Sequence, residues 1–285
     1  MVKEIESFNL DSLLEYALDA ARSAGEEVMK IYHESYDIYT KKDESPVTKA
    51  DLLANSIIND ILSKTNFPIL SEESEDDESR LESNCVWVVD PIDGTKGFIN
   101  KDGDFAIQIG LVVDEEPVIG VVYLPVFDKM YYAIKGRGAY LLDGKGEDSK
   151  KRLYVKYEDS LEDSVIFVSK NHYSEEMKEL IEDLKVKEVH HVGGVGVKLG
   201  LISEGKSVMD FKLTSQCSEW DLCGPQCILE EAGGYVYDVY GNPIHYNKRV
   251  PRISSGYVAT SFTKKTELLQ HLSPFIRKHF ETSSN

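Results

Sequence analysis

The sequence predicts a mixed α/β protein, and three features of the chain support this prediction. Two segments with helical spacing of apolar residues come first, short strand-like segments joined by tight turns follow, and strands alternate with helices beyond residue 150. Residues 143–152 are charged and lack apolar periodicity. We therefore expect a soft boundary there, between an N-terminal α+β part at 1–150 and a C-terminal α/β part at 151–285.

Both expected N-terminal helices have recognisable starts. The first covers residues 12–33, and Ser12 with Glu15 has the spacing of a capping box. The second opens at Thr48-Lys49-Ala50-Asp51 and continues to Leu62. Taken alone, Asp51 in that motif is more simply a helix cap than a functional group.

Strand-like segments fill most of the remaining N-terminal part, and short connections between the last four suit antiparallel hairpins. They lie at 67–70, 86–89, 105–113, 117–123, 129–134 and 138–142. Four further strands are expected in the C-terminal part, at 165–168, 208–213, 235–239 and 257–260. Helices are expected at 175–184, at 199–204, from just after Asp221 to about 232, and at 264–280.

Composition excludes several classes of partner. The chain of 285 residues carries a net charge of -18, which disfavours nucleic acid and anionic membranes. No apolar run approaches the roughly 20 residues that span a bilayer, and the first residues lack the apolar core of a signal peptide, so we expect a cytoplasmic protein. The four cysteines lack zinc-site spacing and are expected to be free, buried thiols.

The motif Asp90-Pro91-Ile92-Asp93-Gly94-Thr95 follows an apolar strand. Pro91 cannot prolong a strand ladder, and Gly94 permits backbone conformations closed to other residues. Two carboxylates, a main-chain carbonyl and the Thr95 hydroxyl can therefore converge, and such hard oxygen ligands suit magnesium. A single motif of this kind more often caps a turn, so other acidic residues must decide between these interpretations.

Other candidate residues each have a simpler interpretation. Glu72 and Glu73 follow a short strand, where they repel one another unless a cation or water screens them. Asp221 precedes a helix and could be its N-cap. His172 follows a strand and could be a surface residue. The glycine-rich stretch 192–198 does not complete a dinucleotide fingerprint, although such a helix entry can hold a phosphate.

Together, Glu72, the motif at 90–95 and Trp220-Asp221 resemble the signature of the inositol monophosphatase superfamily of magnesium-dependent, lithium-sensitive phosphatases. The resemblance runs from about Asp11 to Thr260. Within this superfamily the chain is most similar to 3'(2'),5'-bisphosphate nucleotidases, on the strength of residues 48–51, Lys96, 169–172 and 192–198. Ser71 and Gly97 depart from residues common in the family, but neither departure removes a metal ligand.

The resemblance implies a five-layer αβαβα sandwich and two or three magnesium ions, with inhibition by lithium. One ion would be held by Glu72, Asp90 and the Ile92 carbonyl, and a second by Asp90, Asp93 and Asp221. Asp51 and Thr95 would form the catalytic pair that accepts a proton from an attacking, metal-activated water. Direct attack by water predicts inversion at phosphorus.

The resemblance also implies a small-molecule substrate, with no nucleic acid or membrane partner, and a monomer or homodimer. The expected reaction removes the 3'-phosphate of 3'-phosphoadenosine 5'-phosphate. By similarity, the substrate-binding residues are Gly94, Thr95, Ser169, His172, Gly194, Lys198 and Asp221. An inositol bisphosphate or inositol monophosphate is the alternative substrate, and a non-catalytic metal or nucleotide sensor is the alternative of another class.

Overall fold

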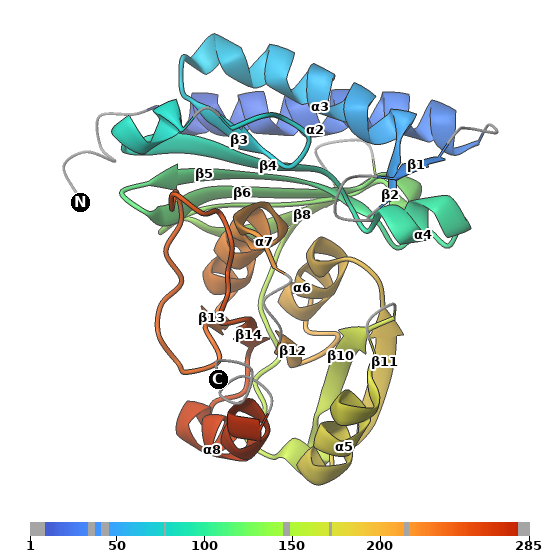
Figure 1. The fold of residues 1–285 in the computed structure, drawn as a ribbon, viewed down its shortest axis with the longest axis vertical. Helices are drawn as coiled ribbons and strands as arrows, with labels where there is room; N and C mark the ends of the chain where they lie inside the picture. The colour runs from blue at the N-terminus through green and yellow to red at the C-terminus, as the bar shows by residue number, and fades with distance from the viewer. Residues whose placement is uncertain are drawn as a thin grey trace.

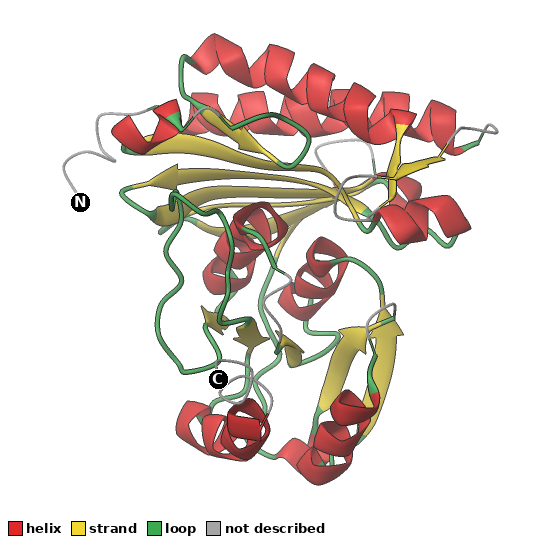
Figure 2. Cartoon of the chain, in the orientation of Figure 1, coloured by secondary structure: helices red, strands yellow, loops and turns green. Residues whose placement is uncertain are grey.

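The computed structural model describes residues 9–33, 38–40, 46–76, 78–144, 149–170, 173–213 and 217–278. Helices and sheets alternate in five layers (Figures 1 and 2). Helices α2 (Leu10–Tyr32) and α3 (Lys49–Leu62) cover the outer face of a seven-stranded sheet. Helices α6 (Val195–Ser203) and α7 (Glu219–Glu231) separate it from a five-stranded sheet, beyond which lie α5 (Glu175–Leu184) and α8 (Lys265–Ile276). The expected αβαβα sandwich is confirmed.

The larger sheet has the order β3-β4-β5-β6-β7-β8-β9. Its strands are β3 (Ile69–Ser71), β4 (Cys85–Asp93), β5 (Ala106–Val113), β6 (Glu116–Leu124), β7 (Lys129–Ile134), β8 (Gly138–Asp143) and β9 (Lys150–Arg152). Among these described strands only β3 and β4 pair in parallel, so the expected antiparallel meander is confirmed. Strand β9 was not predicted, because its three exposed basic residues show no apolar alternation.

The smaller sheet has the order β11-β10-β12-β14-β13. Its strands are β10 (Val165–Ser169), β11 (Glu188–Val192), β12 (Met209–Lys212), β13 (Tyr235–Tyr237) and β14 (Tyr257–Thr260). Strand β10 runs parallel to β11 and β12, whereas β12, β14 and β13 pair antiparallel. Strand β11 was not predicted, because it is an outer strand in which no residue is buried and it lacks the apolar pattern of a core strand.

The start of the first helix differs from the prediction. Asn9 is the N-cap of α2, and its side chain accepts a hydrogen bond from the Ser12 amide at 3.2 Å. The capping box expected at Ser12 is therefore wrong, because the helix has already begun at Leu10. Two short strands, β1 (Ile38–Thr40) and β2 (Pro46–Thr48), form a small antiparallel pair just before α3.

Close packing of α7 on the larger sheet brings the two halves of the chain together. A Cβ at Gly120 would lie 2.3 Å from the Gly224 carbonyl oxygen, and one at Gly110 would lie 2.4 Å from Cys223 Sγ. Only glycine allows this approach, and it carries the start of α7 towards the end of β4. Each of the four cysteines, all within the described residues, is a free buried thiol as expected. Among the described helices, none combines the length and apolar character needed to cross a membrane.

Candidate active site

The motif at 90–95 is shaped by an irregularity at the end of β4. Asp90 pairs with Gln108 and Asp93 with Ala106, so the register against β5 shifts between the two carboxylates. A bulge of this kind re-aims side chains near a strand end. The Ile92 amide donates to Asp90 Oδ1 at 3.0 Å, which fixes one oxygen of that carboxylate.

Three aspartates meet at this point. Asp90, Asp93 and Asp221 each offer one carboxylate oxygen, and these oxygens all lie within 4.8 Å of one another. Asp90 is 1% exposed and Asp93 7% exposed. Buried carboxylates this close repel one another, and a divalent cation removes both the repulsion and the cost of burial. The donor set therefore fits a hard divalent metal ion.

Charge crowding is visible in the pKa values of these groups. Burial raises the pKa of Asp90 well above its usual range, with further contributions, in decreasing order, from the charges of Glu72, Asp93, Asp221 and Asp51. Burial and Asp221 raise the pKa of Asp93 to about 7, opposed by the Gly196 amide and by the positive charges of Lys198 and Lys212. The two carboxylates therefore bind a proton or a cation more readily than exposed carboxylates do.

Asp221 belongs to the first turn of α7 and is not its N-cap. Ser218 is the N-cap, and the Ser218 amide donates to Asp221 Oδ2 at 2.6 Å in a capping box. The predicted helix start was too late, because the capping residue lies three positions before Asp221. Asp221 still belongs to the carboxylate cluster, and the hydrogen bond from the Ser218 amide orients its side chain.

Glu72 reaches the cluster through the parallel pairing of β3 with β4. Ser71 pairs with Val89, and the Glu72 amide donates to the Val89 carbonyl at 3.2 Å. Glu72 therefore lies beside Asp90 in the sheet, which agrees with its effect on the pKa of Asp90. Glu72 is thus a glutamate of this loop whose charge raises the pKa of Asp90.

Asp51 and Thr95 meet as a pair. Asp51 lies in the first turn of α3 and is 2% exposed. The Thr95 hydroxyl lies 3.3 Å from Asp51 Oδ1 and 3.3 Å from the Ile92 carbonyl oxygen. The hydroxyl can donate to either acceptor. It therefore lies between the buried Asp51 carboxylate and the Ile92 carbonyl, which is next to Asp93 in sequence.

Two glycine turns face one another beside the cluster. Gly94 has φ +87°, and a Cβ there would lie 2.6 Å from the Asp104 carbonyl oxygen and 3.5 Å from Gly194 Cα. Gly194 has φ +61° and precedes α6, whose Gly196 amide donates to Asp93 Oδ2 at 2.7 Å. The glycine-rich entry to α6 therefore belongs to the same site as the motif at 90–95.

Lys198 is brought close to the site but is engaged by another residue. It is 4% exposed, and its Nζ lies 2.6 Å from Asp210 Oδ1. The Tyr257 hydroxyl donates to Asp210 Oδ2, also at 2.6 Å. Asp210 and Lys212 were not predicted as site residues, although both charged residues stand in an otherwise apolar strand, which was the available signal.

Of the two substrate contacts predicted after β10, the structure describes one. Ser169 ends β10 and is half-buried, whereas His172 lies outside the described residues. The neighbouring Lys170 pairs with Asp102 at 2.6 Å and Asp104 at 3.4 Å. The end of β10 is therefore tied to the loop after α4 (Thr95–Asn100), which begins within the motif at 90–95.

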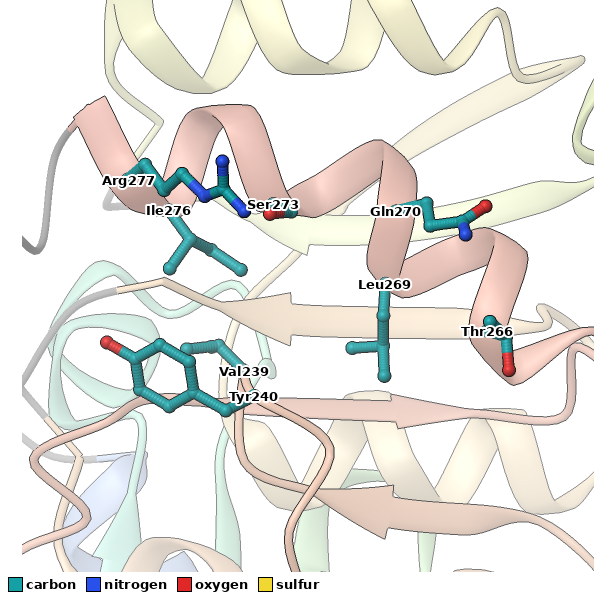
Figure 3. Close-up of a pocket in the computed structure, with 8 residues that line it drawn as sticks. All are labelled: Val239, Tyr240, Thr266, Leu269, Gln270, Ser273, Ile276 and Arg277. Atoms are coloured by element: carbon teal, nitrogen blue, oxygen red, sulfur yellow. The ribbon is translucent and has the colours of Figure 1, made fainter.

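A separate pocket of about 360 Å³ lies against α8 (Figure 3). Its lining combines Val239 and Tyr240 with six residues of α8 and its end: Thr266, Leu269, Gln270, Ser273, Ile276 and Arg277. Arg277 is the charged member of this described lining. Its described lining has no carboxylate to balance the charge of a divalent metal, so we take the aspartate cluster as the candidate active site.

A family model described as the inositol monophosphatase family matches residues 9–274. The chain belongs to this family. It is 32% identical over 253 residues to the 3'(2'),5'-bisphosphate nucleotidase CysQ of Aggregatibacter actinomycetemcomitans, covering 86% of this chain and 91% of that one. Against the protein of the same name from Escherichia coli K12, the identity is 31% over 250 residues, covering 86% and 98%.

Solved structures agree with this assignment. CysQ from Bacteroides thetaiotaomicron, described as a bacterial member of the inositol monophosphatase family, superposes with a TM-score of 0.76 at 33% identity, covering 88% of this chain and 97% of that one. The extragenic suppressor protein suhB from Bartonella henselae gives a TM-score of 0.78 at 26% identity, with coverage of 92% and 98%. These matches confirm the family and the resemblance to its nucleotidases.

Proposed function

We propose that the protein is a magnesium-dependent phosphomonoesterase that removes the 3'-phosphate of 3'-phosphoadenosine 5'-phosphate, giving AMP and inorganic phosphate. The observation that carries this proposal is the buried cluster of Asp90, Asp93 and Asp221 with the Asp51–Thr95 pair beside it. The substrate class follows from the nucleotidase relatives, which span most of the chain.

Glu72, Asp90 and the Ile92 carbonyl would hold one magnesium ion, and Asp90, Asp93 and Asp221 a second. Asp90 contributes to both sets, so it is the hardest ligand to replace. When bound, magnesium supplies positive charge to the phosphate oxygens and makes nearby water more acidic. Two or three ions, and inhibition by lithium in place of one of them, belong to this proposal.

Asp51 and Thr95 move the proton of the attacking water. As water oxygen bonds to phosphorus, its proton passes to Thr95 Oγ1, and the Thr95 hydroxyl proton passes to Asp51. The bond from phosphorus to the 3'-oxygen breaks on the opposite side, the leaving 3'-oxygen takes a proton from solvent water, and Asp51 afterwards returns its proton to solvent. No side chain becomes phosphorylated, so a single displacement with inversion at phosphorus is expected.

Substrate recognition needs local positive features in a protein of net charge -18. The amides of Gly94 and Thr95 would contact the transferred phosphate, and Ser169, His172 and Gly194 the remainder of the nucleotide. Lys198 and Lys212 both lower the pKa of Asp93, so their charge reaches the site, and we assign them to the second phosphate. Lys198 would share its ammonium between that phosphate and Asp210.

An inositol phosphatase is the second candidate, because the metal site serves any phosphomonoester and the matching family model is described as the inositol monophosphatase family. The test is phosphate release in magnesium buffer from 3'-phosphoadenosine 5'-phosphate, inositol 1,4-bisphosphate and inositol 1-phosphate in parallel. A clear preference for the nucleotide supports the proposal. A preference for either inositol phosphate would leave the metal site standing and reject the assigned substrate.

A further inference from the structure

A buried arginine links the segment after Glu72 to residues 247 and 248, which contact the start of α7. Arg80 lies in the short 3-10 helix Ser79–Glu82 that follows Glu72 in the chain, and it is 2% exposed. Its Nη1 donates to Asn247 Oδ1 at 2.7 Å, and its Nη2 donates to the Lys248 carbonyl at 2.9 Å. Asp76, four residues after Glu72, accepts from Arg80 Nη2 at 2.7 Å and Nε at 3.1 Å.

The Asn247 side chain also hydrogen-bonds the main chain around Arg80. Its Nδ2 donates to the carbonyl oxygens of Arg80 at 3.2 Å and of Ser83 at 3.1 Å. The side chain is thus used as both acceptor and donor against one short stretch of chain. A fork of bidentate contacts from a buried guanidinium fixes direction as well as distance.

The same residues hold the start of α7. Glu219 is 0% exposed and stands two positions before Asp221. Its Oε2 accepts from the Asn247 amide at 2.7 Å, and its Oε1 accepts from the Lys248 amide at 3.0 Å. Asn247 has φ +58°, and this left-handed turn lets two successive amides serve one carboxylate.

The proposed metal ligands need such a link. Glu72 and Asp90 are held together by sheet pairing, but Asp221 arrives on α7 from the other half of the chain. The carboxylate oxygens of Asp90, Asp93 and Asp221 lie within 4.8 Å of one another and repel. Close packing holds Cys223 and Gly224 on the sheet, but the pairing of β3 with β4 does not itself restrain the turn of α7 that carries Asp221. A chain of hydrogen bonds from Asp76 through Asn247, anchored on the buried side chains of Arg80 and Glu219, supplies a restraint at the first turn of α7.

We propose that Arg80, Asn247 and Glu219 form a clamp that sets the distance between Glu72 and Asp221 and so preorganises the site for its metal. The three are positioning residues, and the inference rests on the proposed metal-dependent function. Groups behind a ligand commonly change metal affinity by about 10- to 100-fold when altered.

The test is calorimetric titration of Mn²⁺ into wild-type protein and into Asn247→Gly and Arg80→Lys. Glycine at 247 allows the left-handed turn and keeps the amides of residues 247 and 248 that donate to Glu219. It removes the Asn247 side chain, which hydrogen-bonds Arg80. Lysine at 80 keeps the charge but loses the planar fork. We expect both variants to bind Mn²⁺ about tenfold more weakly, with kcat regained at saturating metal and KM for the nucleotide unchanged.

Arg249→Gln is the matched control. Arg249 pairs with Glu78 and thus joins the same two segments, but both side chains are exposed. Its loss should leave Mn²⁺ affinity within about twofold of wild type. Melting of the metal-free proteins separates a general loss of stability from a change at the site.

Three outcomes would overturn the inference. If Asn247→Gly and Arg80→Lys melt earlier than wild type yet bind Mn²⁺ equally well, the clamp is merely structural. If Arg249→Gln weakens Mn²⁺ binding as much as they do, the buried link has no special role. If wild-type protein binds no Mn²⁺, the proposed metal site fails together with the clamp.

Discussion

The Thr95 hydroxyl lies 3.3 Å from Asp51 Oδ1, which joins the starts of two helices that are 44 residues apart in sequence. The same hydroxyl lies 3.3 Å from the Ile92 carbonyl, one of the proposed metal ligands. Asp51 is therefore connected to the proposed metal ligands through the Thr95 hydroxyl. It can accept a proton there without itself being a metal ligand.

Removing either member of this pair should reduce kcat with little effect on metal binding. We expect Thr95→Ala and Asp51→Asn to lower kcat by about 10² to 10⁴-fold, because each breaks the route of the proton. Thr95→Ser keeps the hydroxyl and should retain most activity. Steady-state kinetics together with Mn²⁺ titration would check this, and an unimpaired Thr95→Ala enzyme would remove the pair from the mechanism.

Stability of the metal-free protein should fall as pH rises. Burial and Asp221 raise the pKa of Asp93 to about 7, above its usual value near 4, so the folded state holds this proton more tightly than the unfolded state. The stabilisation is complete at pH below about 4 and is lost as pH rises through 7, with a cost of roughly 2 to 4 kcal/mol.

Asp93→Asn is the control for this pH dependence. It should flatten the dependence without abolishing it, because burial also raises the pKa of Asp90. Calorimetry between pH 5 and 8 would measure both proteins without metal. Equal slopes for the two proteins would rule out Asp93 as the titrating group.

Replacing Gly94 should destabilise the fold for two reasons: its positive φ, and the lack of space for a Cβ. Gly94 and Gly136 have φ of +87° and +78°, but a Cβ at Gly136 would meet no described atom within 4 Å, whereas one at Gly94 would lie 2.6 Å from the Asp104 carbonyl oxygen. We expect Gly136→Ala to lower the free energy of unfolding by about 1 kcal/mol and Gly94→Ala by about 3 kcal/mol or more. Urea denaturation would compare them, and equal losses would contradict the packing argument.

The buried pair of Lys198 and Asp210 should show strong coupling. Lys198→Met would remove the charged partner of buried Asp210 and leave the Tyr257 hydroxyl as the side-chain donor that the described residues give it, at a cost of about 3 to 5 kcal/mol. Adding Asp210→Asn should recover part of this loss, because the buried charge is removed. A double-mutant cycle by chemical denaturation tests the coupling, and additive losses would show that the two side chains act independently.

Local sequence signals predicted the elements and residues that bring the site together. The apolar run before Asp90 predicted β4, but the strand end expected at Pro91 is wrong, because a bulge lets β4 continue through Pro91 to Asp93. Gly94 then separates the strand from α4, which begins at Thr95. Alternation of strands and tight turns predicted each end of β5 to β8 to within one residue. These features depend on neighbours in sequence, which explains why the sequence shows them.

What the sequence did not reveal depends on contacts between distant residues. Strands β9 and β11 lack an apolar pattern and exist because a neighbouring strand offers hydrogen bonds. The link from Arg80 to Asn247 spans 167 positions, and no spacing rule connects them. The capping of α7 at Ser218 was missed because Asp221 also suits an N-cap in sequence.

The most direct test of the central claim is phosphate release from 3'-phosphoadenosine 5'-phosphate by wild-type protein and Asp90→Asn, each with magnesium and after chelation. We predict magnesium-dependent release by wild type and a loss of about 10³-fold or more in the folded variant, because Asp90 serves both proposed metal sets. Release that persists after chelation, or an Asp90→Asn enzyme close to wild type, would contradict this claim.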